Sequence, residues 1–330
     1  MATMFLNRAI AAATMKEMAA DNNVILMGED IINRGGGLSI FMGVAENFPD
    51  RCFDMPICES GYTHFSNGAA IAGLRPIVDL MFSDFAFIAG DAIVNNSAKF
   101  RFNSLGTINV PSVFVFGNGG RGTFGTAGSG STHSQCSEAW FMNVPGLKIV
   151  APYYAEDAYG LMRSCIRDND PTVFFYHEGS LGVKSEVPDD EDFIIPLNNA
   201  AKIRSEGDDI TIVAIQSMVP LADKAAEELR AEGISCEVID PRVIIPFDEE
   251  KVIKSVNKTG HLLIVHEAPV RGGVGGEIAT IVGEKCFTTL KAPIKRLGAL
   301  NSPIPCNMAE SLMMPNVEKI KAAVKEVLKK

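Results

Sequence analysis

Short apolar runs alternate with longer amphipathic stretches along the first half of the chain. Residues 23–28, 75–82 and 110–117 have the pattern of buried strands, and residues 62–74 and 86–102 have the pattern of helices between them. An order in which strands and helices alternate predicts a parallel sheet with helices on both faces.

A second series of the same kind fills the last third of the chain. Strands are predicted at 209–216, 235–240 and 261–268, with helices at 221–233 and 248–260 and a terminal helix at 315–330. The stretch between the two series, residues 184–209, is acidic, contains two prolines and lacks apolar periodicity, which is typical of a domain connection. We therefore expect an α/β protein of two doubly wound domains, residues 1–190 and 206–330, with a linker over 191–205.

Composition and charge narrow the possible partners. The chain has 330 residues, of which 47% are hydrophobic and 21% charged, so it can bury a large core. Its net charge of -10 argues against nucleic acid and against anionic membranes, because phosphate groups are bound by basic surfaces. A small-molecule substrate is the expectation that remains.

Targeting signals and metal-binding spacings are not evident in the sequence. Residues 1–23 have the pattern of an amphipathic helix rather than of a signal peptide, and no run approaches the roughly 20 apolar residues that cross a bilayer. Seven cysteines without CxxC spacing are typical of buried thiols in a reducing compartment. The five histidines are dispersed, which argues against structural zinc. We expect a cytoplasmic protein.

Two residues stand out as candidates for acid–base chemistry. Glu59, in PICESG, follows the apolar MPIC and is expected at the C-terminal end of a strand, where open parallel sheets bind ligands. A carboxylate placed there can accept a hydrogen bond from a ring nitrogen. The alternative is that Ser60 caps a helix and Glu59 only lies in its first turn, and the residues alone favour neither interpretation.

His133, in THSQC, follows a glycine-rich stretch at 117–132. Those glycines permit close approach of the backbone to a ligand or to another chain. The alternative is a flexible surface loop, but the apolar segment that follows at once favours a binding loop. An imidazole in such a loop can move a proton at neutral pH.

Other motifs carry less information when taken alone. Phe85 can stack on a ring but is more typical of a core, and Glu29 stands at another strand end. The glycines of 271–277 follow a strand and open a helix, but no acidic residue follows at the distance that dinucleotide binding requires. We therefore attribute them to close packing of a helix on a strand. There is no GxSxG, Walker or HExxH motif.

Taken together, the motifs resemble one family along residues 3–330. It is the beta subunit of the thiamine-diphosphate-dependent first component of 2-oxo acid dehydrogenase complexes and of acetoin dehydrogenase. The resemblance rests, in chain order, on PICESG, GLRPIVDLMFSDF, NNSAKFRF, THSQ, VPGLKIVAP, DAYGLMRSCIRDNDP, VIDPRVIIPFD, HEAPVRGG and APIKRLGA. It implies a pyrimidine-binding domain followed by a transketolase-type C-terminal domain, with the diphosphate and its magnesium held by a separate alpha chain.

The resemblance also implies residue roles. Glu59 matches the glutamate that bonds the aminopyrimidine nitrogen and thereby activates the thiazolium carbon. Phe85 matches the aromatic residue that packs on the pyrimidine, and Glu29 matches a glutamate of the same site. His133 matches the histidine implicated in reductive acyl transfer to lipoamide.

Two positions depart from the family pattern. Ile88 stands where many pyruvate-type chains have Gln, and Thr132 replaces the Gln before the histidine; both change the polarity expected of the pocket.

The resemblance further implies a metal site. Backbone carbonyls hold a structural potassium ion in some members of the family, here at Cys165, Asp168 and Asp170.

The function implied by the resemblance is that of an enzyme subunit. In a heterotetramer of two alpha and two beta chains it decarboxylates pyruvate or cleaves acetoin, and it passes the acyl group to the lipoyl domain of a dihydrolipoyl acyltransferase core. Branched-chain 2-oxo acids are the alternative substrates. A non-catalytic assembly subunit is the alternative from another class, and the presence of both Glu59 and His133 argues against it.

Overall fold

The computed structural model describes residues 2–120, 128–190 and 192–329. The chain forms two compact units. The N-terminal unit consists of Met1–Asn118 and Trp140–Leu197, and the C-terminal unit consists of Gly119–Ala139 and Asn198–Lys330. The segment that carries His133 thus belongs to the C-terminal unit. Among the described residues, no helix combines the length and the apolar character needed to cross a bilayer.

The N-terminal unit is built on a parallel sheet, as predicted. Its strands lie in the order β6-β7-β5-β4-β2-β3, with all neighbours parallel. The bounds are β2 (Val24–Gly28), β3 (Cys52–Asp54), β4 (Arg75–Phe82), β5 (Val113–Asn118), β6 (Lys148–Val150) and β7 (Thr172–His177). The strands predicted at 23–28, 75–82 and 110–117 are confirmed as β2, β4 and β5.

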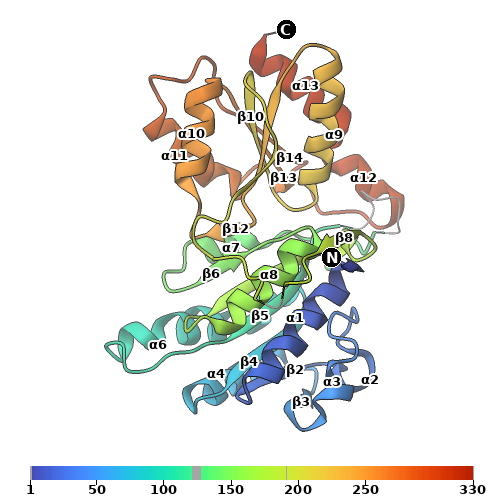
Figure 1. Ribbon diagram of the computed structural model, residues 1–330, viewed down its shortest axis with the longest axis vertical. Coiled ribbons are helices and arrows are strands. Elements are labelled where there is room, and N and C mark those ends of the chain that lie inside the picture. Colours follow the sequence, from blue (N-terminus) through green and yellow to red (C-terminus); the bar gives the residue numbers. More distant parts are fainter. Residues whose placement is uncertain (1, 121–127, 191, 330) are drawn as a thin grey trace. The chain divides into compact units, whose positions relative to one another are not determined.

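Helices cover this sheet, and two of them lie side by side in Figure 1, α1 and α8. The helices of this unit are α1 (Leu6–Ala20), α2 (Ile31–Arg34), α3 (Val44–Asn47), α4 (Glu59–Ile71), α5 (Ala86–Asp91), α6 (Ala98–Asn103) and α8 (Ala155–Arg167), and α7 (Glu138–Met142) spans the boundary between the units. Short 3-10 turns occur at Pro49–Arg51, Ser83–Phe85 and Glu178–Ser180.

The helix predicted at 86–102 is confirmed, with one irregular turn. A π-helical turn, Ala92–Ser97, joins α5 to α6. The buried amide of Asn67, in α4, donates to the carbonyl of Ala92 at 2.9 Å and accepts from the hydroxyl of Ser97 at 2.6 Å. In a π-helical turn some backbone groups lack their usual helical partners, and side chains bond them instead. The amide of Asn67 therefore holds α4 against the segment that begins at Phe85.

The C-terminal unit has a second sheet in the order β14-β13-β10-β11-β9, in which only β9 is antiparallel to its neighbour. Its strands are β9 (Lys202–Ser205), β10 (Ile210–Ala214), β11 (Cys236–Asp240), β13 (Leu262–Pro269) and β14 (Lys295–Ala299), and β12 (Val243–Ile245) follows β11 in the chain. Its helices are α9 (Met218–Ala231), α10 (Glu249–Thr259), α11 (Gly275–Lys285), α12 (Glu310–Met313) and α13 (Val317–Leu328), with a 3-10 turn at Asn307–Ala309. The predicted strands and helices of this half are confirmed.

The interpretation of residues 184–209 as a loop without regular structure is wrong. This stretch contains β8 (Lys184–Val187), which pairs antiparallel with β1 (Ala2–Phe5), and also β9. Both strands lie at the edges of their pairings and are only partly buried. Edge strands of this kind lack the continuous apolar run that marks a strand inside a parallel sheet.

The glycines of 271–277 pack a helix on a strand, as the sequence indicates. A Cβ atom on Gly275, at the start of α11, would lie 3.0 Å from Cγ2 of Ile264 in β13. The glycine therefore lets the helix approach the sheet closely, and no phosphate is needed to explain it.

A buried ion pair joins α1 to α8. Glu17 accepts from Nε of Arg163 and from Nε of Arg167, both at 2.7 Å, and Arg163 also donates to the carbonyl of Phe193 at 2.8 Å. The side chain of Arg163 is only 1% exposed. Replacement of Glu17 removes a carboxylate that bonds this buried guanidinium.

We expect Glu17→Ala to lower the free energy of unfolding by about 3–5 kcal/mol, because it removes one partner of a buried ion pair. Denaturant unfolding monitored by circular dichroism measures the effect. The matched control is Lys285→Ala, which removes a solvent-exposed pair with Glu249 and is expected to cost less than about 1 kcal/mol. Equal losses in the two variants would contradict the account of the buried pair.

Candidate functional site

Glu59 is the first residue of α4, not the end of a strand. The strand before it, β3, ends at Asp54, so the expectation that MPIC forms the strand is wrong. The alternative interpretation is confirmed in part: Glu59 lies in the first turn of a helix, but Cys58 and not Ser60 holds the cap position, and it makes no side-chain cap bond. The carboxylate of Glu59 therefore lies at a helix N-terminus, where the helix dipole favours negative charge, and Glu59 is only 6% exposed.

Glu29, which follows the end of β2, lies near Glu59. Glu29 is 7% exposed, and its Oε1 has no hydrogen-bond partner among the described residues. Burial raises the pKa of Glu29, and the negative charges of Glu59 and Asp30 raise it further. The structure thus brings Glu29 and Glu59 together. Oε1 of Glu29 is a buried acceptor that has no partner among the described residues.

Two further residues, which the sequence analysis did not single out, complete this buried cluster. Asp79, in β4, is fully buried; its Oδ1 accepts from the backbone N–H of Met81 at 3.1 Å, and its Oδ2 has no partner among the described residues. The hydroxyl of Tyr62 donates to the carbonyl of Asp79 at 3.4 Å. Burial raises the pKa of Tyr62, and the charges of Glu29, Asp79 and Glu59 add to the increase.

Glycine makes room for the carboxyl group of Asp79. A Cβ on Gly36 would lie 2.0 Å from Oδ2 of Asp79, and the positive φ of Gly36 excludes most other residues in any case. Burial, and to a lesser degree the charge of Glu29, raises the pKa of Asp79 to about 7. An aspartate inside the apolar run RPIVDLMF was the available signal for this residue.

The raised pKa of Asp79 predicts a pH dependence of stability. In the unfolded chain the carboxyl group ionises near its ordinary value, so the folded state binds more protons and loses stability as the pH rises towards 7. Between about pH 5 and pH 8 we expect Asp79→Asn to gain roughly 2–3 kcal/mol relative to the wild type, because the amide does not ionise. Denaturant unfolding at several pH values measures this slope. A difference between the two proteins that does not change with pH would contradict it.

Phe85 and Ile88 follow β4 and enter α5, which packs against α4. Phe85 is half-buried, and its ring meets that of Phe82 edge-on at 5.7 Å. Ile88 is 53% exposed, and the neighbouring Phe87, at 71% exposure, stacks on Trp140 at 4.0 Å. The N-terminal unit thus brings Phe85 and Ile88 to the helix that begins at Glu59.

His133 lies in the C-terminal unit, and the other predicted cofactor residues lie in the N-terminal unit. The imidazole is half-buried, and its Nδ1 lies 2.9 Å from the hydroxyl of Thr132. The N–H of His133 donates to the carbonyl of Gly130 at 3.2 Å. The hydroxyl at position 132 is thus a hydrogen-bond partner of one ring nitrogen, and the tautomer of the ring decides which of the two groups donates. Residues 121–127 of the glycine-rich stretch lie outside the described residues.

Several cationic side chains from other elements contact the turn that is predicted to hold potassium. The carbonyl of Cys165 accepts from the N–H of Asp168 at 3.3 Å, and the carbonyl of Asp168 accepts from Arg75 at 3.0 Å. Lys148 contacts the carboxylate of Asp168 at 2.6 Å, and Arg101 contacts that of Asp170 at 2.6 Å. The potassium assignment stays a prediction, and these groups give it no support.

A second cluster joins residues far apart in the sequence. Donor atoms of Cys136, Glu138 and His266 lie within 4.8 Å of one another. Nε2 of His266 lies 3.2 Å from Oε1 of Glu138, and both side chains are buried. A hydrogen-bonded carboxylate–imidazole pair explains this contact without a metal.

Of the seven cysteines, only Cys52, Cys165, Cys236 and Cys286 are buried.

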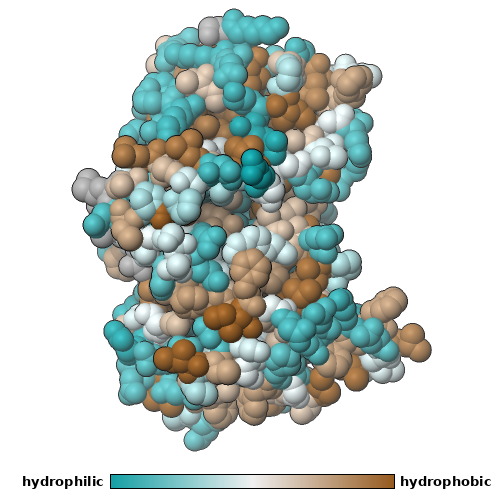
Figure 2. Space-filling model, turned by 180° about the vertical axis from the view of Figure 1, so that it is seen from behind, coloured by the Kyte–Doolittle hydropathy of each residue, from teal (hydrophilic) through white to brown (hydrophobic). Residues whose placement is uncertain are grey.

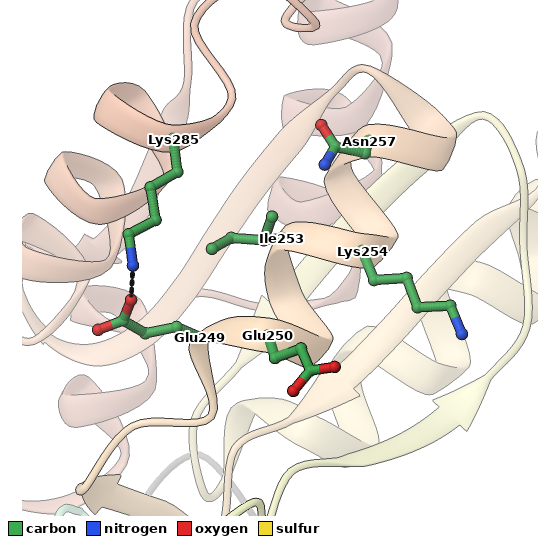
Figure 3. A pocket seen from close by; sticks show the side chains of 6 residues that line it. All are labelled: Glu249, Glu250, Ile253, Lys254, Asn257 and Lys285. Atoms are coloured by element: carbon green, nitrogen blue, oxygen red, sulfur yellow. Dashed lines mark hydrogen bonds and ion pairs between the residues drawn. The ribbon is translucent and has the colours of Figure 1, made fainter.

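A surface hollow on the C-terminal unit contains none of the predicted site residues. Figure 3 shows its lining on α10 and α11, where Glu249 and Lys285 form an ion pair and the other side chains point apart. The lining residues are Glu249, Glu250, Ile253, Lys254, Asn257 and Lys285. Exposed charges of both signs are typical of a solvated helix face, so the buried cluster around Glu59 is the better candidate site.

Two family models match the chain one after the other. Residues 3–184 match the family described as transketolase, pyrimidine binding domain, and residues 199–320 match transketolase, C-terminal domain. A solved structure described as split gene transketolase, inactive beta4 tetramer, aligns over 99% of this chain and 98% of its own, with a TM-score of 0.79 and 21% identity. At that identity the likeness shows the fold alone. Two such domains in this order define a chain of the transketolase type.

Curated relatives specify the family further. The pyruvate dehydrogenase E1 component subunit beta-1, mitochondrial, of Arabidopsis thaliana is 43% identical over 98% of this chain and 88% of its own length. The pyruvate dehydrogenase E1 component subunit beta of Rhizobium meliloti is 41% identical over 99% and 70%. The 2-oxoisovalerate dehydrogenase subunit beta of Bacillus subtilis is 38% identical over 99% of both chains. The chain belongs to this family of beta subunits of the E1 components of 2-oxo acid dehydrogenases.

Proposed function

We propose that this chain, together with an alpha chain, forms a thiamine-diphosphate-dependent E1 component that decarboxylates pyruvate and passes the acetyl group to lipoamide. The observation that carries the proposal is the buried acidic cluster at the start of α4, inside a domain that matches a pyrimidine-binding family. When bound, thiamine diphosphate supplies a carbon that attacks the 2-oxo group and accepts the electrons released with carbon dioxide. The diphosphate and its magnesium are assigned to the alpha chain.

The residues of the N-terminal unit fit the aminopyrimidine half of that cofactor. The carboxyl group of Glu59 is buried at a helix N-terminus, where the helix dipole favours negative charge, so its oxygens can accept a hydrogen bond from a protonated ring nitrogen. Glu29 offers its unpartnered Oε1 in the same cluster. The half-buried ring of Phe85 offers an aromatic surface for packing.

His133 is assigned to the later transfer step. Its imidazole can give or take a proton at neutral pH, which the reduction of the lipoyl disulfide requires.

Exposed apolar side chains on the N-terminal unit support assembly with other chains. Figure 2 shows apolar surface at the projecting end that carries α6, at the lower right of the view. The exposed residues of this unit include Ile57, Phe65, Phe87, Ile88, Phe102 and Leu105, with exposures from 53% to 93%. Apolar surface of this extent is costly in water, and we assign it to contacts in a heterotetramer of two alpha and two beta chains. A stable monomer in the presence of the alpha chain would contradict this assignment.

The substrate is tested by steady-state turnover. The chain, co-expressed with its alpha chain and supplied with thiamine diphosphate and a dye acceptor, is compared on pyruvate, acetoin and 2-oxoisovalerate. We expect the largest kcat/KM with pyruvate, because relatives of the pyruvate type reach 43% identity. Preference for acetoin or for 2-oxoisovalerate would overturn the substrate assignment and would fit an apolar pocket at Ile88. A formed tetramer without any turnover would favour a non-catalytic assembly subunit.

A further inference from the structure

The segment that carries His133 is anchored by acidic side chains of the C-terminal unit. The N–H of Gly120 donates to Oε1 of Glu267 at 2.5 Å. The other oxygen of Glu267 accepts from the hydroxyl of Ser217. Glu267 lies in β13 and is 2% exposed, so the carboxylate that holds Gly120 comes from a buried strand of the second sheet.

A second acidic side chain lies against the same segment. Glu310, the first residue of α12, is fully buried. A Cβ on Gly120 would lie 2.5 Å from Oε1 of Glu310, and a Cβ on Gly128 would lie 2.1 Å from its Oε2. A side chain at either position would displace this carboxyl group, so Gly120 and Gly128 both pack against Glu310.

Backbone contacts complete the attachment. Ser129 and Cys306 form an antiparallel bridge, and the N–H of Gly119 donates to the carbonyl of Gln135 at 3.0 Å. Two residues after Cys136, Glu138 bonds His266, which is the neighbour of Glu267 in β13. Residues on both sides of His133, namely Gly120, Ser129 and Glu138, thus bond β13 or the segment that leads into α12.

We propose that Glu267 and Glu310 are positioning residues, which hold Gly120 and Gly128 and thereby place the imidazole of His133 for acyl transfer. The inference rests on the transfer role proposed for His133. Both carboxyl groups act through the backbone of these glycines. The glycines at 120 and 128 serve this packing, in addition to any contact with a ligand.

The test uses the enzyme assembled with its alpha chain and measures two rates: decarboxylation with a dye acceptor and acylation of a lipoyl domain. We expect Glu267→Ala to lower the ratio of lipoyl acylation to dye-linked decarboxylation about 10- to 100-fold, because displacement of a reacting group by about 1 Å has such effects. Glu267→Gln keeps a carbonyl oxygen for the N–H of Gly120 and is expected to restore most of the ratio. An equal loss of both rates in Glu267→Ala would overturn the inference, because it indicates general damage.

Glycine variants provide an independent arm. Gly128→Ala drives a Cβ into Glu310 and is expected to lower the same ratio. The matched control is Gly283→Ala, in α11, where an added Cβ meets nothing within 4 Å, and it is expected to keep the ratio of the wild type. An unchanged ratio in Gly128→Ala would overturn the role of Glu310.

Hydrogen exchange separates this inference from the proposed function. Peptides that cover residues 128–138 are expected to exchange faster in Glu267→Ala and in Gly128→Ala than in the wild type. If His133→Ala lowers lipoyl acylation and these two variants do not, the proposed function stands and the positioning role is overturned. If His133→Ala leaves lipoyl acylation intact, the role of His133 fails, and unchanged exchange in the two variants would overturn the anchoring as well.

Discussion

Glu59→Gln is expected to lower turnover of the assembled enzyme by at least about 100-fold with every substrate, which is the range of acid–base catalysis. The amide keeps the size of the side chain but removes the negative charge that the N-terminus of α4 stabilises. The loss should appear in kcat with both the dye acceptor and the lipoyl domain, since activation of the cofactor precedes both. Steady-state rates at saturating thiamine diphosphate measure it.

The matched control for this variant is Glu46→Gln, at an exposed position of α3 in the same unit. It removes the same charge far from the buried cluster and is expected to keep the activity of the wild type. The heterotetramer should form in both variants, as checked by light scattering. A Glu59→Gln enzyme with normal turnover would contradict the role assigned to this carboxylate.

His133→Ala is expected to separate the two half-reactions. Acylation of the lipoyl domain should fall by about 100-fold or more, because the proton donor for the lipoyl sulfur is lost. Decarboxylation with a dye acceptor should fall much less, because the dye needs no such proton. The ratio of the two rates, measured on one enzyme preparation, is the readout.

His261→Ala serves as the histidine control. This imidazole lies in the C-terminal unit and bonds the carbonyl of Asp209 at 2.9 Å, so its loss can affect stability but not one half-reaction alone. We expect its ratio of the two rates to match the wild type. Equal loss of both rates in His133→Ala would mean that this histidine acts before the transfer step.

The sequence predicted the buried parts of the fold well and the edges poorly. Strands β2, β4 and β5 lie inside a parallel sheet and are mostly apolar, so the pattern locates their ends to within three residues. Strands β8 and β9 are short, partly exposed edges within an acidic stretch, and nothing in their composition separates them from a loop. The segment before Glu59 was also predicted wrongly. MPIC is apolar, but it is too short and too close to a helix to form a strand.

The candidate site could be predicted only in part. Sequence motifs pointed to Glu29, Glu59, Phe85 and His133, but their roles come from a resemblance. Asp79 joins the cluster through the register of β2 and β4, in which Gly28 lies beside Asp79. Tyr62 joins it from α4, through the hydrogen bond of its hydroxyl to the carbonyl of Asp79. The contacts of Glu267 and Glu310 with the glycine-rich segment depend on tertiary packing between residues that are far apart in the chain, and no local pattern encodes them.

We propose that this chain supplies the pyrimidine half of a thiamine diphosphate site, which an alpha chain completes. The most direct measurement is titration calorimetry of thiamine diphosphate with magnesium against this chain alone, the alpha chain alone and the assembled pair. The account predicts tight binding of the cofactor to the assembled pair, and binding at least about 100-fold weaker to either chain alone, because each holds only part of the contacts. Equal affinity for this chain alone and for the pair would contradict a shared site, and an assembled pair that binds no cofactor would contradict the proposed function.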